Sequence, residues 1–202
     1  MQPDTGDRKL QELLARAHSG DLVLFSGKGL VSGAIRLFTG SCWSHVGLVI
    51  RDPHSGEPLL LESTVTDESS DLVLGRPVRG VQMVRLADKL AVYEGRVALR
   101  RLELEQRSPG FEEELRELAE IWRYRGYKSF TWTLLLDLLS GNRRPPRVHR
   151  VFCSELVAEI YKRLGLMTRA VRSSRCVPGD FGHAHVPWLT DARLSEPVLL
   201  KP

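Results

Sequence analysis

The chain has 202 residues, 42% of them hydrophobic and 27% charged, so it is long enough to bury a core, and we expect one globular domain over residues 1–202. The net charge of +4 at pH 7 is mild and the basic excess is local, so specific nucleic-acid binding is not predicted. An odd number of cysteines without C-x-x-C spacing excludes a disulfide framework and a zinc knuckle and fits a reducing compartment; they are Cys42, Cys153 and Cys176.

The N-terminal region predicts a helix, a strand and a connector, but no targeting segment. It lacks a basic stretch followed by an apolar run, and later apolar runs are too short or too charged to span a bilayer, so we expect a soluble cytoplasmic protein. Apolar residues at helical spacing predict a helix over residues 9–18, and a short apolar run predicts a buried strand over 21–25. Residues 26–40 contain four glycines, match neither a P-loop nor a dinucleotide motif, and are interpreted as a connecting loop and short helix.

A predicted hairpin brings a histidine and a glutamate to one face of a sheet. Residues 43–50 and 58–62 are strand-like and flank a polar turn that contains proline and glycine. Folding about the centre of this turn places Glu62 either across from His45 or diagonal to it, opposite Gly47. Both registers put the two side chains on the same face, where a carboxylate can orient an imidazole. The alternative is that His45 lies at a strand end and its ring nitrogens form hydrogen bonds with solvent.

The middle of the chain predicts more sheet and two helices. Strands are expected over residues 81–86 and 96–102, which with the earlier ones make a small, mainly antiparallel sheet. A helix is expected from a cap at Ser108 through Tyr124, with its three glutamates on a solvated face. Residues 130–139 have the composition of a buried helix or an interaction surface.

The turn over residues 142–150 is strongly basic, and two interpretations of it carry equal weight. Either it is a solvated loop, or it forms one wall of the approach to Cys153 and binds an anionic membrane surface. Its cations are Arg143, Arg144, Arg147 and Arg150. Further on, His183 and His185 have no third ligand nearby in the sequence, so no metal site is predicted.

A cysteine is predicted at the first turn of an amphipathic helix. The apolar residues that follow recur every three to four positions and form one buried stripe: Leu156, Val157, Ile160, Tyr161 and Leu164. Gly165 can end this helix. Unpaired N–H groups and the helix dipole then favour the thiolate of Cys153 and lower its pKa. The alternative is that Cys153 is a small buried hydrophobic residue.

The order of histidine strand, acid strand and cysteine helix resembles the circularly permuted papain-like hydrolases of the NlpC superfamily. The similarity is to the YiiX/YebB-like group, which is related to the lecithin retinol acyltransferase-like enzymes. The strings that carry it are Ser44-His45-Val46-Gly47, Leu61-Glu62-Ser63 and Phe152-Cys153-Ser154-Glu155-Leu156. Ordinary papain-like enzymes have the cysteine helix before the histidine strand, whereas the permuted group has the inverted order seen here. Residues 20–25 and 178–181 resemble the family's opening strand and closing turn.

The resemblance implies an α+β, permuted papain-like fold, in which a small, mainly antiparallel sheet packs against helices and the catalytic cysteine lies at a helix N-terminus. Residue by residue, it implies Cys153 as nucleophile, His45 as base and Glu62 as the group that orients His45. The implied activity is that of a thiol hydrolase or acyltransferase, without cofactor or metal, acting on an amide, thioester or ester bond. Its substrate would be an amide, a peptide or a lipid-acyl group.

Two other classes of function compete with this one. A non-catalytic module of the same fold would bind an anionic partner, such as lipid head groups or nucleic acid, through the basic turn. Such a module has no physical need of a thiol, an imidazole and a carboxylate together. A redox thiol is disfavoured because Cys153 has no resolving cysteine nearby in the sequence. Substrate identity, hydrolysis against transfer, the second oxyanion-hole donor and the oligomeric state stay open.

Overall fold

The strands form one large sheet, mainly antiparallel as the sequence predicts. The computed structural model describes residues 5–65, 68–123, 125–127 and 150–202. Within these residues eight strands are ordered β10-β5-β1-β2-β3-β4-β7-β8, and only the β7–β8 pair is parallel. The strands are β1 (Leu22–Gly27), β2 (His45–Arg51), β3 (Pro58–Thr64), β4 (Gly80–Arg85), β5 (Gly95–Arg100), β7 (Gly126–Tyr127), β8 (Arg150–Val151) and β10 (Val198–Lys201). A second pair joins β6 (Leu102–Leu104) to β9 (Ala192–Leu194).

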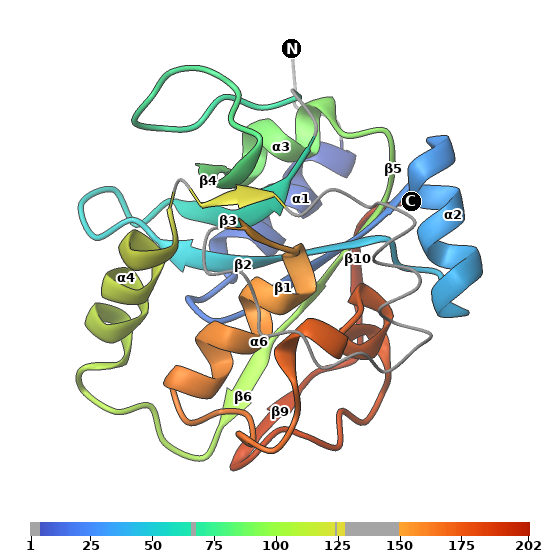
Figure 1. Cartoon of the computed structure of the whole chain (residues 1–202). Coiled ribbons are helices and arrows are strands. Elements are labelled where there is room, and N and C mark those ends of the chain that lie inside the picture. The colour runs from blue at the N-terminus through green and yellow to red at the C-terminus, as the bar shows by residue number, and fades with distance from the viewer. Residues whose placement is uncertain (1–4, 66–67, 124, 128–149) are drawn as a thin grey trace.

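Helices cover both faces of this sheet (Figure 1). The described helices are α1 (Thr5–Ala15), α2 (Leu30–Thr39), α3 (Leu86–Val92), α4 (Phe111–Trp122), α6 (Cys153–Arg163) and the short 3₁₀ helices η1 (Ser173–Arg175) and η2 (Pro178–Gly182). Helices α4 and α6 pack on one face, and α1 and α3 on the other. None of these helices has the length and apolar character needed to cross a bilayer.

Burial on both faces explains the character of the central strands. On β2, Val46 and Leu48 belong to the core under α6, whereas Val49 belongs to the core under α3. Strands enclosed on both faces are apolar without alternation, as β1 is from Leu22 to Phe25. Polar side chains that point into either core therefore need partners within the protein.

Several predicted boundaries differ from the observed ones. Helix α3 is not among the predicted elements, because its seven residues directly follow β4 and its first residue, Leu86, continues the apolar pattern of the strand expected over residues 81–86. Helix α4 begins after Gly110, not at a Ser108 cap; the Ser108 carbonyl instead accepts the Phe111 N–H at 3.1 Å. Strand β3 continues to Thr64, since Ser63 and Thr64 pair with β4. Tyr124 and the predicted 130–139 helix lie outside the described residues.

Buried polar side chains connect distant parts of the chain. The guanidinium of Arg100, fully buried on β5, donates to the carbonyls of Phe181 and His183 at 2.6 Å each. It also donates to the carbonyls of Leu194 and Ser195, so one side chain joins the sheet to the C-terminal segment.

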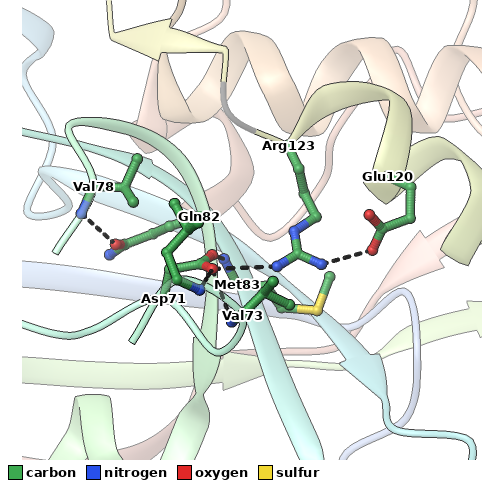
Figure 2. A network of polar contacts seen from close by, with 8 residues as sticks. Asp71, Val73, Val78, Gln82, Met83, Glu120 and Arg123 are labelled. Carbon is green, nitrogen blue, oxygen red and sulfur yellow. Dashed lines mark hydrogen bonds and ion pairs between the residues drawn. The ribbon is translucent and has the colours of Figure 1, made fainter. Parts of the chain in front are cut away.

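The segment between β3 and β4 is held by a second buried group, Asp71 (Figure 2). Its Oδ1 accepts the Val73 N–H at 3.0 Å and an Arg123 N–H at 3.3 Å, and its Oδ2 accepts the Met83 N–H at 3.0 Å. The carboxylate therefore joins its own turn, β4 and the end of α4.

Candidate active site

Cys153 is the first residue of α6, as predicted, and its side chain is buried. The residue before it, Phe152, has an extended backbone and forms the N-cap. The apolar stripe faces the sheet as expected, and the helix ends just before Gly165, which has a φ of 73° and donates its N–H to the Lys162 carbonyl. The thiol consequently lies at the positive end of a packed helix.

His45 and Glu62 occupy neighbouring strands and contact each other directly. Strands β2 and β3 are antiparallel and pair Leu48 with Leu61, so the next pair in the same register is Gly47 with Glu62. Glu62 is therefore diagonal to His45. This is the second of the two predicted registers. The His45 Nε2 lies 2.7 Å from Glu62 Oε2, so the carboxylate binds one side of the imidazole.

The third contact joins the imidazole to the thiol. Cys153 and His45 share a side-chain hydrogen bond, and since Nε2 faces Glu62, Nδ1 is the ring nitrogen left for the sulfur. The ring of Phe25, on the adjacent strand β1, packs beside the imidazole, with 5.3 Å between the two ring centroids. The structure therefore brings together the three residues singled out from the sequence.

The pKa values of these groups favour a charged pair. Burial alone would raise the pKa of the Cys153 thiol, but the His45 imidazolium and the backbone N–H groups of Val46 and Ser154 lower it overall. Burial would lower the pKa of His45, but the Cys153 thiolate and Glu62 outweigh it and raise that pKa to about 9. Both shifts act in the direction that favours thiolate and imidazolium over their neutral forms.

Two further residues that the sequence patterns did not single out surround Glu62. Lys89 Nζ on α3 lies 3.0 Å from Glu62 Oε1, and the Gln82 side-chain amide on β4 donates to the same oxygen at 3.0 Å. All three side chains are almost completely buried. Burial would raise the pKa of Glu62, but Lys89, His45 and Gln82 lower it to about 2.

Local sequence signals for both residues exist. Lys89 belongs to a helix whose Leu86 and Leu90 face the core one turn apart, and position 89 lies on that same side. Gln82 alternates with Val81 and Met83, so it points to the opposite face of the strand, where it pairs with Glu62. A lone polar residue at an inward strand position indicates a buried partner.

The remaining candidate residues do not join this cluster. Cys42 is exposed, and Cys176 is a buried thiol whose pKa is raised to about 12 by burial and by Asp180. His183 and His185 are exposed. In the described part of the chain no three His, Cys, Asp or Glu side chains converge as metal ligands.

Most of the basic turn lies outside the described residues. Arg143, Arg144 and Arg147 lie outside the described residues, and of Arg150 only the backbone, in β8, is described.

Comparison with solved structures relates the fold to that of a bacterial protein. The metalloprotein YiiX from Escherichia coli O157:H7 is 22% identical in sequence, with a TM-score of 0.53 over 78% of this chain and 69% of that chain. The chain thus has the permuted papain-like fold of YiiX, as predicted. No protein-family model matches the sequence, and no match was found among the curated proteins.

Proposed function

We propose that the protein is a cysteine-dependent hydrolase or acyltransferase that acts on an amide, thioester or ester bond. The observation that carries this proposal is the continuous series of contacts from the Cys153 thiol through His45 to Glu62, with Cys153 at the start of α6. Thiol, imidazole and carboxylate in this order match the requirements of nucleophilic acyl transfer. The permuted papain-like fold is consistent with the same chemistry.

In the proposed reaction, the Cys153 thiolate attacks the carbonyl carbon and forms a C–S bond while the carbonyl electrons move to oxygen. The Cys153 N–H at the helix start is one donor to this oxyanion. The intermediate collapses with loss of the amine, alcohol or thiol, which takes its proton from the His45 imidazolium. Water or another acceptor, deprotonated by His45, then attacks the thioester and releases the acyl group. Glu62 holds the imidazole in position through both steps.

A metal has no part in this proposal. The solved structure of YiiX is described as that of a metalloprotein. Here, however, His45 Nε2 and Glu62 Oε2 bind each other. The described residues also contain no group of three side chains that converge as metal ligands. We therefore assign no metal-dependent step to the described side chains.

Alkylation by iodoacetamide at mildly acidic pH tests the proposal. Cys153 should react faster than Cys42 although Cys42 is exposed, and on the order of a hundredfold faster than the neutral thiol of Cys176. Peptide mass mapping over time gives the three rates within one sample, so Cys42 and Cys176 serve as internal controls. His45→Ala should slow the reaction at Cys153 alone.

Equal rates at Cys153 and Cys42 would mean that Cys153 is an inert structural thiol. The non-catalytic binding module would then be the better description. A Cys153→Ala variant that retains turnover of p-nitrophenyl esters would also contradict the proposal.

A further inference from the structure

Helix α2 exposes large apolar side chains and directs Arg36 into the protein. Leu30 and Leu37 are 95% and 82% exposed, and Phe38 is 56% exposed. Arg36, in contrast, donates to the Ser26 hydroxyl at 2.9 Å and to the Gly27 carbonyl at 2.7 Å. A helix at the surface of a globular protein ordinarily has the opposite orientation.

The exposed side chains share one face of α2. At 100° per residue, Leu30 and Leu37 project in nearly the same direction, and Phe38 is the next position around the helix. Figure 1 shows α2 at the margin of the molecule, beyond the end of β1. Large apolar side chains grouped on one exposed face mark an interaction surface.

A cationic surface hollow of about 450 Å³ lies next to α2, lined by Arg36 of the helix and by residues just before and after it. Its lining includes Lys28, Arg36 and Arg96 together with the small side chains of Ser26, Ser41 and Cys42. Lys28 and Arg96 are exposed, and the lining, which also includes Gly95 and the C-terminal Pro202, contains no aspartate or glutamate side chain. Cations beside an apolar face suit a partner that presents negative charge above an apolar interior.

We propose that the apolar face of α2 and this cationic hollow dock on the surface of an anionic phospholipid bilayer. The leucines enter the boundary between head groups and acyl chains, and Lys28 and Arg96 lie at the level of the phosphates. A second copy of the chain fits this surface poorly, because it would bring the same cations of both molecules together.

Docking of this kind would bring the bilayer to the end of the sheet that carries the candidate active site. Ser26 in the lining directly follows Phe25, which pairs with His45 across β1 and β2. The docking itself requires no catalysis, so a Cys153→Ala variant of the full chain should bind vesicles as tightly as the wild type.

Sedimentation of the full chain with vesicles tests the proposal. Vesicles of equimolar phosphatidylcholine and phosphatidylserine should bind the protein, and pure phosphatidylcholine vesicles should bind it much more weakly. Leu30→Gln with Leu37→Gln should weaken binding at least about tenfold, because the apolar insertion is lost. Lys28→Gln with Arg96→Gln should weaken it on the order of thirtyfold at low salt, and added salt should reduce this difference.

Matched controls separate this surface from general effects of composition. Val92→Gln with Ile121→Gln removes two half-exposed apolar residues from α3 and α4, and Arg85→Gln with Arg172→Gln removes two exposed cations elsewhere. Both controls should bind like the wild type. Circular dichroism should show every variant folded, since the substituted side chains lie outside the cores.

Three outcomes would overturn the proposal. They are binding that does not depend on phosphatidylserine, binding that the α2 variants leave unchanged, and a dimer in light scattering that depends on Leu30 and Leu37 without any vesicle binding. The first would mean that anionic lipid is not what the surface recognises, the second would place the contact elsewhere, and the third would make a second copy the occupant.

Discussion

The carboxylate of Glu62 is fully enclosed, so the ionic state of the candidate site depends on its few neighbours. His45 binds one oxygen, and Lys89 and Gln82 share the other. An enclosed carboxylate without a cation tends to take up a proton, which would remove the negative charge that supports the His45 imidazolium. Lys89 thus acts on the thiol indirectly, as a positioning residue three contacts away, through Glu62 and His45.

Lys89→Met, which keeps the length of the side chain and removes its charge, should raise the pKa of Glu62 toward its ordinary value. The rate of Cys153 alkylation should then fall on the acidic side of its pH profile, where the wild-type protein still reacts. Stability should drop by about 3 kcal/mol, because a buried charge loses its partner. Iodoacetamide rates measured from acidic to neutral pH test the profile, and urea unfolding tests the stability.

Arg85→Met is the matched control, because it removes a cation from the N-cap of the same helix, where Arg85 pairs in solvent with Glu57. Its alkylation profile should match the wild type. If Lys89→Met loses stability but keeps the wild-type profile, Lys89 is only a structural residue.

At the scale of elements, side-chain acceptors help to attach the segment between β3 and β4 to its surroundings. Asp71 binds the N–H groups of Val73, Leu74 and Met83, while the Gln82 side chain accepts the Val78 N–H at 3.4 Å (Figure 2). Because Gln82 also donates to Glu62, the conformation of this segment is linked to the site.

Asp71→Asn should lower the free energy of unfolding by about 2 to 3 kcal/mol. The amide retains one acceptor oxygen, so either the Met83 N–H or the turn N–H groups lose their partner, and the pair with Arg123 loses its charge. Urea unfolding followed by circular dichroism measures the loss. Asp88→Asn, at an exposed acid on α3, is the control and should change stability little. Equal effects of the two substitutions would contradict the account of this segment.

At the scale of the whole molecule, the lowered pKa of Glu62 couples its ionisation to folding. The pKa of Glu62 is about 2 in the folded protein and 4.5 for an ordinary glutamate. Between pH 2 and pH 4.5 the unfolded chain therefore binds more protons than the folded protein. This contribution to stability is present above pH 4.5 and is lost as the pH falls toward 2.

Glu62→Gln should therefore flatten the dependence of unfolding free energy on pH in this acidic range. The wild type should lose about 3 kcal/mol more than the variant between neutral pH and the acid limit. Urea titrations at a series of pH values provide the measurement, and Glu57→Gln, at a partly exposed acid, is the control. Parallel curves for wild type and Glu62→Gln would show that Glu62 is not held ionised by its neighbours.

The sequence by itself determined the parts of the fold that depend on short-range patterns. Apolar spacing places Cys153 at the start of α6, and the length of the turn restricts the His45–Glu62 hairpin to two registers that share a face. Period-two and period-3.6 patterns are set by the backbone geometry of neighbouring residues, so they are visible without the rest of the molecule.

Only the tertiary structure decided which of these faces meet. Cys153 and His45 are 108 positions apart (153 minus 45), and no local pattern encodes their hydrogen bond. Lys89 became part of the site because α3 packs across β3 and β4. Helix α2, the short helix expected within residues 26–40, turned out to present its leucines outward. A sequence pattern distinguishes the two faces of an element, but the packing of distant elements selects the face that is buried, because burial is a property of the whole assembled chain.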